Sequence, residues 1–311
     1  MKKIREGIEE YLAVRRALGF KMLAVGRFLR DFVHFAELEG APRITTELAV
    51  RWATHRKTCQ PPQWANRLCA LRLFAEYWKA VDPKTEVPPR GLLPHRYKRK
   101  PPYIYSDEEV ARLVQLMKEI ESPMQLDGLT YSTLTGLLAV TGMRVNEALS
   151  LSRDDVNLRD GVITVRNTKS GEIRLLPVHA TTLEILRGYG HRRDHIVPHP
   201  RDPYFFIIER GVRPCRTTLF RLFVNVSRQI GIRGPNDSHG PRLHDLRHRF
   251  AVETLLSWYR DGKNVDQHLP SLSQYLGHVE TPNTYWYISA TPELLRLATL
   301  RLERGERRSG L

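Results

Sequence analysis

Cysteine is scarce in this sequence, and no two cysteines lie close together. The 311 residues include three cysteines, and Cys59, Cys69 and Cys215 form no Cys-x-x-Cys pair. An odd number of widely spaced cysteines argues against a disulfide framework, and the missing Cys-x-x-Cys pair argues against a structural zinc site. We therefore expect a chain that works in a reducing compartment without a bound metal or other cofactor.

Long apolar runs are also missing. Residues 1–6 carry mixed charge with no apolar stretch behind them, which is unlike a secretory signal. No segment approaches the ~20 consecutive apolar residues that a membrane span needs. These absences predict a cytoplasmic protein with no membrane segment.

Acidic residues are too few to balance the basic ones. The chain has 49 Lys and Arg against 34 Asp and Glu, a formal net charge of +15. Such an excess favours a polyanionic partner, which could be DNA, RNA or an anionic membrane surface. Of these, we expect nucleic acid.

Residues 1–86 have the pattern of a helical domain, with four helices expected between about residues 4 and 82. Phe28, Phe32 and Phe35 follow the helical period, and we interpret this stripe as core packing rather than as a base-stacking surface. Basic residues off the stripes are candidates for phosphate contacts. They are Arg15, Arg16, Lys21, Arg27, Arg30 and Arg67.

Residues 87–105 contain no acidic residue and have the composition of a linker. Pro88, Pro89, Pro94, Pro101 and Pro102 favour an extended, semi-stiff chain. The basic residues between them are Arg90, Arg96, Lys98, Arg99 and Lys100. A nuclear address has a similar composition, but the position between two domains favours a linker that follows the phosphates of a nucleic acid.

Residues 106–311 predict a second domain, mainly helical with a small antiparallel β-sheet. Ser106 and the three acidic residues after it are typical of a helix start. Residues 162–165 and 173–178 are expected to pair as strands around a turn at Ser170 and Gly171. The expected helices cover about residues 106–117, 129–140, 216–229, 244–258, 270–276 and 292–303.

Two short segments place an arginine three residues from a partner, so that both side chains share a helix face. Arg144 and Glu147 lie in TGMRVNEAL, and His244 and Arg247 lie in LHDLRH. The first pair alone could be a surface salt bridge. The second could present a cation and a proton carrier to a phosphate. His244 and His248 also have the spacing of a zinc-binding helix, but the glutamate of that motif and a third ligand are absent.

Two further residues are ambiguous when taken singly. Lys169 is expected at the tip of the hairpin, where a lysine is usually just solvated. Tyr287 follows His278 by nine residues, in a Tyr/Trp run that would ordinarily be core. Tyr287 could be a nucleophile if His278 and the arginines converge on it.

Taken in order, these motifs resemble the catalytic domain of the tyrosine recombinase, or phage integrase, family. The elements are Arg144 with Glu147, the Lys169 hairpin, His244-x-x-Arg247, and Leu-Gly-His with Tyr287 behind it, over about 145 residues. The four N-terminal helices are similar to the family's core-binding domain, which is SAM-like. The segment TPNTYWYISATPEL looks closest to transposon-borne integrases of the transposase A type.

The resemblance implies a role for each motif residue. Tyr287 would attack the scissile phosphate to form a 3′-phosphotyrosine, and Arg144 and Arg247 would bind the non-bridging oxygens. Lys169 would protonate the departing 5′-oxygen, and His244 would carry the tyrosine proton. His278 would donate a hydrogen bond to the phosphate, and Glu147 would support Arg144.

Several alternatives stay open at this point. Tyr285 lies two residues before Tyr287 and could be mistaken for the nucleophile, although the family spacing favours Tyr287. A relaxing topoisomerase shares the same chemistry. A non-catalytic DNA-binding regulator could keep the fold, and a plain RNA-binding protein would not need Lys169 and Tyr287 in register.

The resemblance also implies partners. We expect double-stranded DNA on a bacterial nucleoid, a tetramer of this chain on two paired DNA sites, and possible cooperation with other recombinases of the same mobile element. The helix near the C-terminus is expected to dock on a neighbouring protomer.

Overall fold

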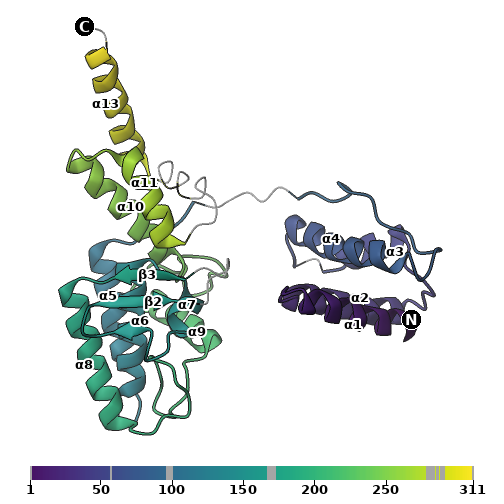
Figure 1. Ribbon diagram of the computed structural model, residues 1–311, viewed down its shortest axis with the longest axis horizontal. Helices are drawn as coiled ribbons and strands as arrows, with labels where there is room; N and C mark the ends of the chain where they lie inside the picture. The colour runs from purple at the N-terminus through teal and green to yellow at the C-terminus, as the bar shows by residue number, and fades with distance from the viewer. Residues whose placement is uncertain are drawn as a thin grey trace. The chain divides into compact units, whose positions relative to one another are not determined.

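The chain folds into two compact units, residues 1–100 and 101–311, in a computed structural model (Figure 1). The structure describes residues 2–56, 58–95, 101–166, 173–277, 284, 287 and 291–309, the last of these with side chains up to residue 300. Each unit has its own hydrophobic core.

The N-terminal unit is a bundle of four helices, which confirms the expected number. The helices are α1 (Lys2–Ala17), α2 (Leu23–Leu38), α3 (Thr46–Thr54) and α4 (Pro61–Trp78). Local chemistry sets two of the starts, because the Thr45 side chain accepts a hydrogen bond from the backbone N–H of Leu48, and prolines occupy the first turn of α4. Phe32 is fully buried and Phe28 and Phe35 pack against the same core, so the aromatic stripe is core packing.

The expectation that Arg67 contacts phosphates is wrong. Its side chain is only 4% exposed and donates a hydrogen bond of 2.8 Å to Asp31, while its guanidinium lies 4.3 Å from the Trp52 ring centre. Trp52 Nε1 donates to the same Asp31 carboxylate. Arg67 is thus a packing residue, because no phosphate can reach a cation enclosed in this way.

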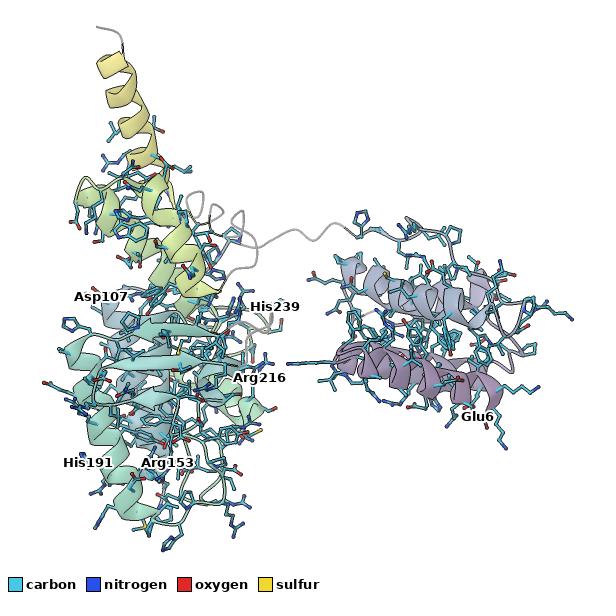
Figure 2. The ribbon with its side chains drawn as sticks, in the orientation of Figure 1. Glu6, Asp107, Arg153, His191, Arg216 and His239 are labelled. Carbon is cyan, nitrogen blue, oxygen red and sulfur yellow. The ribbon has the colours of Figure 1, made fainter. Side chains whose placement is uncertain are left out.

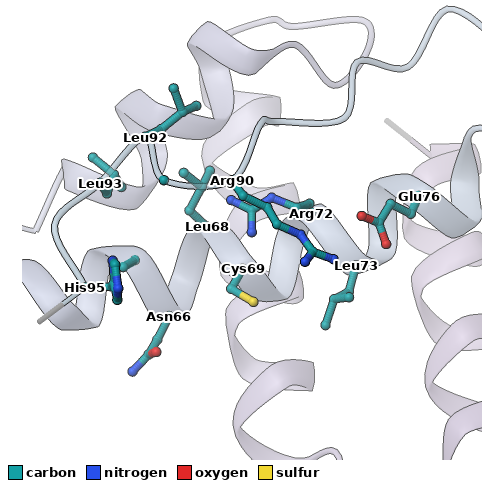
Figure 3. A pocket seen from close by; sticks show the side chains of 12 residues that line it. Asn66, Leu68, Cys69, Arg72, Leu73, Glu76, Arg90, Leu92, Leu93 and His95 are labelled. Atoms are coloured by element: carbon teal, nitrogen blue, oxygen red, sulfur yellow. The ribbon is translucent and has the colours of Figure 1, made fainter.

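Residues 88–95 pack on the helical bundle. The linker expected over residues 87–105 therefore begins too early in the sequence. Arg72 of α4 donates hydrogen bonds of 2.6 and 2.8 Å to the carbonyls of Pro88 and Pro89. A cavity of about 340 Å³ lies between α4 and residues 90–95, beside Cys69 and Arg72 (Figure 3). At the other side, Tyr105 is buried in the core of the second unit. Between these packed ends, residues 96–100 lie outside the described residues.

In its described residues, the second unit combines helices with a three-stranded antiparallel sheet of order β1-β2-β3. The strands are β1 (Val156–Asn157), β2 (Val162–Val165) and β3 (Arg174–Pro177), with Ile163 opposite Leu176. The helices are α5 (Asp107–Lys118), α6 (Leu126–Thr141), α7 (Val145–Leu149), α8 (Ala180–Ile196), α9 (Arg216–Gln229), α10 (Asp245–Arg260), α11 (Val265–Leu276) and α13 (Pro292–Ser309). None of the helices in the described ranges is both long and apolar enough to cross a membrane.

Helix α6 lies at the centre of this unit and is buried on nearly all sides, between α5, α8 and α10. Asp107, labelled in Figure 2, starts α5 after the expected cap at Ser106 and forms an ion pair with Arg249 of α10. Tyr105 donates a hydrogen bond to the carbonyl of Arg242, just before α10. The start of α10 is therefore held against the first residues of the unit.

The predicted helices and the predicted strand pair of this unit are confirmed, and the structure adds α8 and β1. The turn expected at Ser170 and Gly171 lies outside the described residues. Helix α11 starts at Val265, and Pro270 is its sixth residue, beyond the first turn that proline favours, which is why the prediction began the helix at Pro270. Helix α8 was not predicted. Its residues are mostly polar, with Gly188 and Gly190 inside, so its sequence lacks a clear apolar stripe.

We predict that Arg67→Ala lowers the free energy of unfolding of the N-terminal unit by about 2 kcal/mol, because Asp31 loses an enclosed cationic partner. Urea denaturation followed by circular dichroism measures the change. Arg16→Ala is the matched control, because Arg16 is exposed. Equal stability of the two variants would contradict the packing role of Arg67.

Candidate active site

Arg144 lies at the junction between α6 and α7. Helix α6 ends at Gly142, whose φ of 61° is left-handed, and a Cβ there would lie 2.7 Å from the Phe250 ring. Glycine is therefore required for both reasons. Arg144 then caps α7, with its backbone N–H donating to Glu147 Oε2 at 2.9 Å and its Nη1 donating to Glu147 Oε1 at 2.8 Å. This reciprocal pair fixes the direction in which the Arg144 side chain leaves the backbone.

Two guanidinium groups meet at the end of α11. Arg144 Nη2 donates to the carbonyl of Gly277 at 2.7 Å, and Arg247 Nη2 donates to the neighbouring carbonyl of Leu276 at 2.6 Å. Arg247 Nη1 donates to the carbonyl of Gly142 at 2.8 Å. Carbonyls at helix C-termini carry partial negative charge, so they can hold cations. The ends of α6 and α11 thus bring together the arginines of two separate sequence motifs.

The Glu147 carboxylate is buried and binds a second arginine that the sequence analysis missed. Arg174 of β3 donates to Glu147 Oε2 at 2.6 Å and to Oε1 at 3.2 Å. Burial raises the pKa of Glu147, but Arg174 and Arg144 together outweigh it and hold that pKa below its usual value. The available signal was the alternation in Ile173-Arg174-Leu175-Leu176, which puts Arg174 on the same inward face as Leu176.

The start of α10 carries two histidines, and the second of them, His248, lies beside Tyr287 in space. The His244 and His248 rings are 5.0 Å apart, and the His248 and Tyr287 rings are 5.4 Å apart. Tyr287 is only 2% exposed. Among the described residues, His248, which the sequence suggested only as half of a zinc pair, is the histidine that contacts the Tyr287 ring.

Burial and neighbouring cations lower the pKa of both histidines to about 4. For His244 the main causes are burial of the ring and Arg247, although the residue as a whole is exposed to solvent. For His248 they are burial and His244, opposed by Asp245. Both imidazoles are consequently neutral at pH 7, and a neutral imidazole can accept a proton.

Arg247 is 2% exposed, and its pKa is lowered to about 10, mainly by burial. A negative charge on Tyr287 acts in the opposite direction and raises the pKa of Arg247. Tyr287 therefore lies near Arg247 as well as beside His248. Such an arrangement can bind an anion beside a tyrosine hydroxyl and accept the proton of that hydroxyl.

Five of the seven expected catalytic residues lie in the described part of the chain. The structure groups Arg144, Glu147, His244, Arg247 and Tyr287 as set out above. Lys169 and His278 lie outside the described residues, as does the alternative tyrosine, Tyr285.

The basic residues expected to contact DNA, in the N-terminal unit and the linker, differ in how exposed their side chains are. Arg16, Arg27 and Arg30 are exposed and Arg15 is half-buried, stacked 4.1 Å from the Phe20 ring centre. Arg30 is also paired with Glu9 at 2.7 Å. Arg96, Lys98, Arg99 and Lys100 lie outside the described residues.

Comparison with known proteins identifies the family. The profile of the phage integrase family matches residues 105–293. A Sinorhizobium fredii protein named as an integrase/recombinase, y4rB, is 46% identical over 98% of both chains. Among solved structures, the Tn1549 transposon integrase in complex with transposon right-end DNA matches 97% of this chain and 98% of its own, with a TM-score of 0.64 and 14% identity. A lambda integrase tetramer bound to a Holliday junction matches 91% of this chain and 76% of its own, with a TM-score of 0.62 and 15% identity.

The family profile covers more than half of the chain, and the y4rB likeness extends over almost all of it. Both agree with the order of the motifs and with the grouping of their residues in the second unit. The chain belongs to the phage integrase family and is a tyrosine site-specific recombinase.

Proposed function

We propose that this recombinase cuts and rejoins duplex DNA through a 3′-phosphotyrosine at Tyr287. The observation that carries the proposal is the position of Tyr287, buried against His248 and close enough to Arg247 for its charge to affect that guanidinium. The transposon integrase solved with DNA supports a duplex substrate.

In the forward step, the Tyr287 oxygen attacks the phosphorus and the bond to the 5′-oxygen breaks. The tyrosine proton passes to a neutral histidine, His244 in our assignment, and Lys169 donates a proton to the departing 5′-oxygen. In the reverse step, the 5′-hydroxyl of another strand attacks and Tyr287 leaves. One phosphoester is exchanged for another each time, so rejoining needs no external energy source.

Arg144 and Arg247 would bind the non-bridging oxygens, on which charge accumulates in the five-coordinate transition state. His278 would donate a hydrogen bond to the same phosphate. Glu147 would support Arg144, with which it already shares two hydrogen bonds. The arginines lie on backbone carbonyls before any phosphate arrives, which supports this division of roles.

We propose further that the chain acts in the cytoplasm, on the nucleoid, in the integration or transposition of a mobile element, as transposon integrases of the transposase A type do. Four protomers on two duplexes would form the active assembly, with other recombinases of the element as further partners. The lambda integrase tetramer on a Holliday junction supports an assembly of four. Candidate phosphate contacts are Arg15, Arg16, Arg27, Arg30, Arg96, Lys98, Arg99 and Lys100.

The covalent intermediate provides the direct test. Nicked suicide duplexes would be made from the DNA that flanks the gene of this chain, and incubated with the protein in EDTA. We expect a covalent protein–DNA band on a denaturing gel with the unaltered chain and with Tyr285→Phe, and none with Tyr287→Phe, because only Tyr287 supplies the attacking oxygen. Loss of the band in Tyr285→Phe alone would reassign the nucleophile. Binding without any band would favour a non-catalytic regulator.

Acid pH should destabilise the second unit through His248. The unfolded chain binds a proton at this histidine near pH 6.5, whereas the folded chain does so only near pH 4. The stabilising contribution is therefore complete above pH 6.5 and is lost as pH falls toward 4. Between pH 7 and pH 5 we expect a loss of roughly 2 kcal/mol in the free energy of unfolding, measured by urea denaturation.

His248→Asn should reduce that pH dependence, because asparagine does not titrate. His191→Asn is the control, because His191 lies exposed on α8 (Figure 2). An identical pH dependence in all three proteins would refute the contribution of His248.

Helix α13 offers a test of the assembly. Leu294 packs into the core of the second unit, whereas Leu295 is 48% exposed and available to a neighbouring protomer. We expect Leu295→Asp, and deletion of residues 295–311, to reduce the yield of paired-site complexes and recombinants at least tenfold more than single-site binding. Ile185→Asp is the control, because Ile185 is an exposed apolar residue of the same size on α8. Equal losses in pairing and single-site binding would contradict docking.

A further inference from the structure

We propose that Arg174 is a positioning residue for the reaction, which holds Arg144 in its phosphate-binding orientation through Glu147 and Gly277. The inference rests on the proposed role of Arg144 at the scissile phosphate. It assigns Arg174 no contact with DNA.

The Glu147 carboxylate uses four hydrogen bonds to join the two arginines. Oε1 accepts from Arg144 Nη1 at 2.8 Å and from Arg174 Nη1 at 3.2 Å. Oε2 accepts from the Arg144 backbone N–H at 2.9 Å and from Arg174 Nη2 at 2.6 Å. A carboxylate has about four lone-pair sites, so every site is occupied. Because Arg174 binds as a two-pronged fork, it fixes the plane of the carboxylate and thereby the position of Arg144 Nη1.

Arg174 also presses against the second anchor of Arg144. A Cβ on Gly277 would lie 2.4 Å from Arg174 Nη1, and Gly277 has a left-handed φ of 68°. The carbonyl of the same glycine accepts the 2.7 Å hydrogen bond from Arg144 Nη2. Arg174 therefore contacts both groups that hold the Arg144 guanidinium.

The two arginines differ in what they leave available. The Arg144 side chain is 30% exposed, whereas that of Arg174 is 8% exposed and directs both terminal nitrogens to Glu147. The Arg174 Nε is buried and has no acceptor among the described residues. Because this donor has no acceptor, the orientation of the Arg174 side chain follows from its other contacts. Arg174 is thus oriented for Glu147 and Gly277, and Arg144 faces outward.

A purely stabilising role explains this arrangement less well. Burying an ion pair costs desolvation energy, and apolar residues of similar volume often replace such a pair without loss of stability. An orienting role gives the buried fork a consequence that apolar packing cannot supply. It also joins β3, which follows Lys169 in the sequence, to Gly277, which precedes His278 in the sequence.

The test compares adduct formation on two versions of a suicide duplex that the unaltered chain cleaves. One carries the normal scissile phosphate. The other carries a methylphosphonate, which lacks one negative charge and so needs less cationic help at one oxygen. The variants are Arg174→Met, Arg174→Lys and Arg144→Met, with Arg153→Met as the control. Arg153 is paired with Asp194 at 2.7 Å, outside the arginine cluster.

On the phosphate duplex, we expect Arg174→Met to slow adduct formation about 10²-fold, the scale of losing one oriented donor. Arg174→Lys keeps the charge but loses the fork, and should slow it about tenfold. DNA affinity, measured by fluorescence anisotropy, should change less than about threefold in both variants, since Arg174 is not expected to touch DNA. One methylphosphonate isomer is expected to reduce the rate defect of Arg144→Met. On that isomer, the rate defect of Arg174→Met should become smaller as well.

A structural defect alone would reduce the rates on both duplexes equally, and that outcome would overturn the proposal, as would a rate equal to that of Arg153→Met. If Arg174→Met does not fold, Glu147→Gln/Arg174→Met leaves no buried carboxylate without a partner. The rate of adduct formation by that double variant should be less than about threefold below that of Glu147→Gln, because both residues act on Arg144. Multiplied losses would refute the shared role. Absence of any adduct with the unaltered chain would instead count against the proposed function.

Discussion

The buried carboxylate of Glu147 determines where the cations of this site can lie. It is nearly inaccessible to water, and it is ionised because two guanidinium groups surround it. One comes from the helix junction at Arg144 and the other from the sheet at Arg174. Without the carboxylate, two like charges would face each other in a region of low dielectric. The junction between α6 and α7, strand β3 and the end of α11 therefore depend on one another through this group.

Arg247 is held in a different way. Within the described residues, its hydrogen bonds go to the carbonyls of Gly142 and Leu276, which offer partial charges rather than a full anion. Burial consequently lowers the pKa of Arg247 to about 10, since its charge is incompletely compensated. A phosphate would supply the missing negative charge. The fold thus accepts a desolvated cation in the free protein, and a bound anion would relieve that cost.

The sequence allowed much of this arrangement to be predicted, since helix period and capping residues are local properties. Arg144, Glu147, His244 and Arg247 could be placed in pairs from their spacing alone. Arg174 could not be found in this way, because its partner is far away in the sequence and a single arginine in a short strand resembles an exposed residue. Arg67 was misplaced for the same reason. Its burial depends on Asp31, and helical periodicity does not reveal which charge on a neighbouring helix will enclose it.

Two of the buried arginines also limit what net charge can say about DNA binding. Arg67 and Arg174 both belong to the basic excess of the chain, yet each is enclosed beside an acidic partner. Neither can contribute to counterion release on binding a duplex. Their function is instead to hold neighbouring groups in place. For Arg174 those groups include Arg144, so a cation that does not face DNA can still affect the reaction, because transition-state stabilisation requires cations that are already oriented when the charge develops.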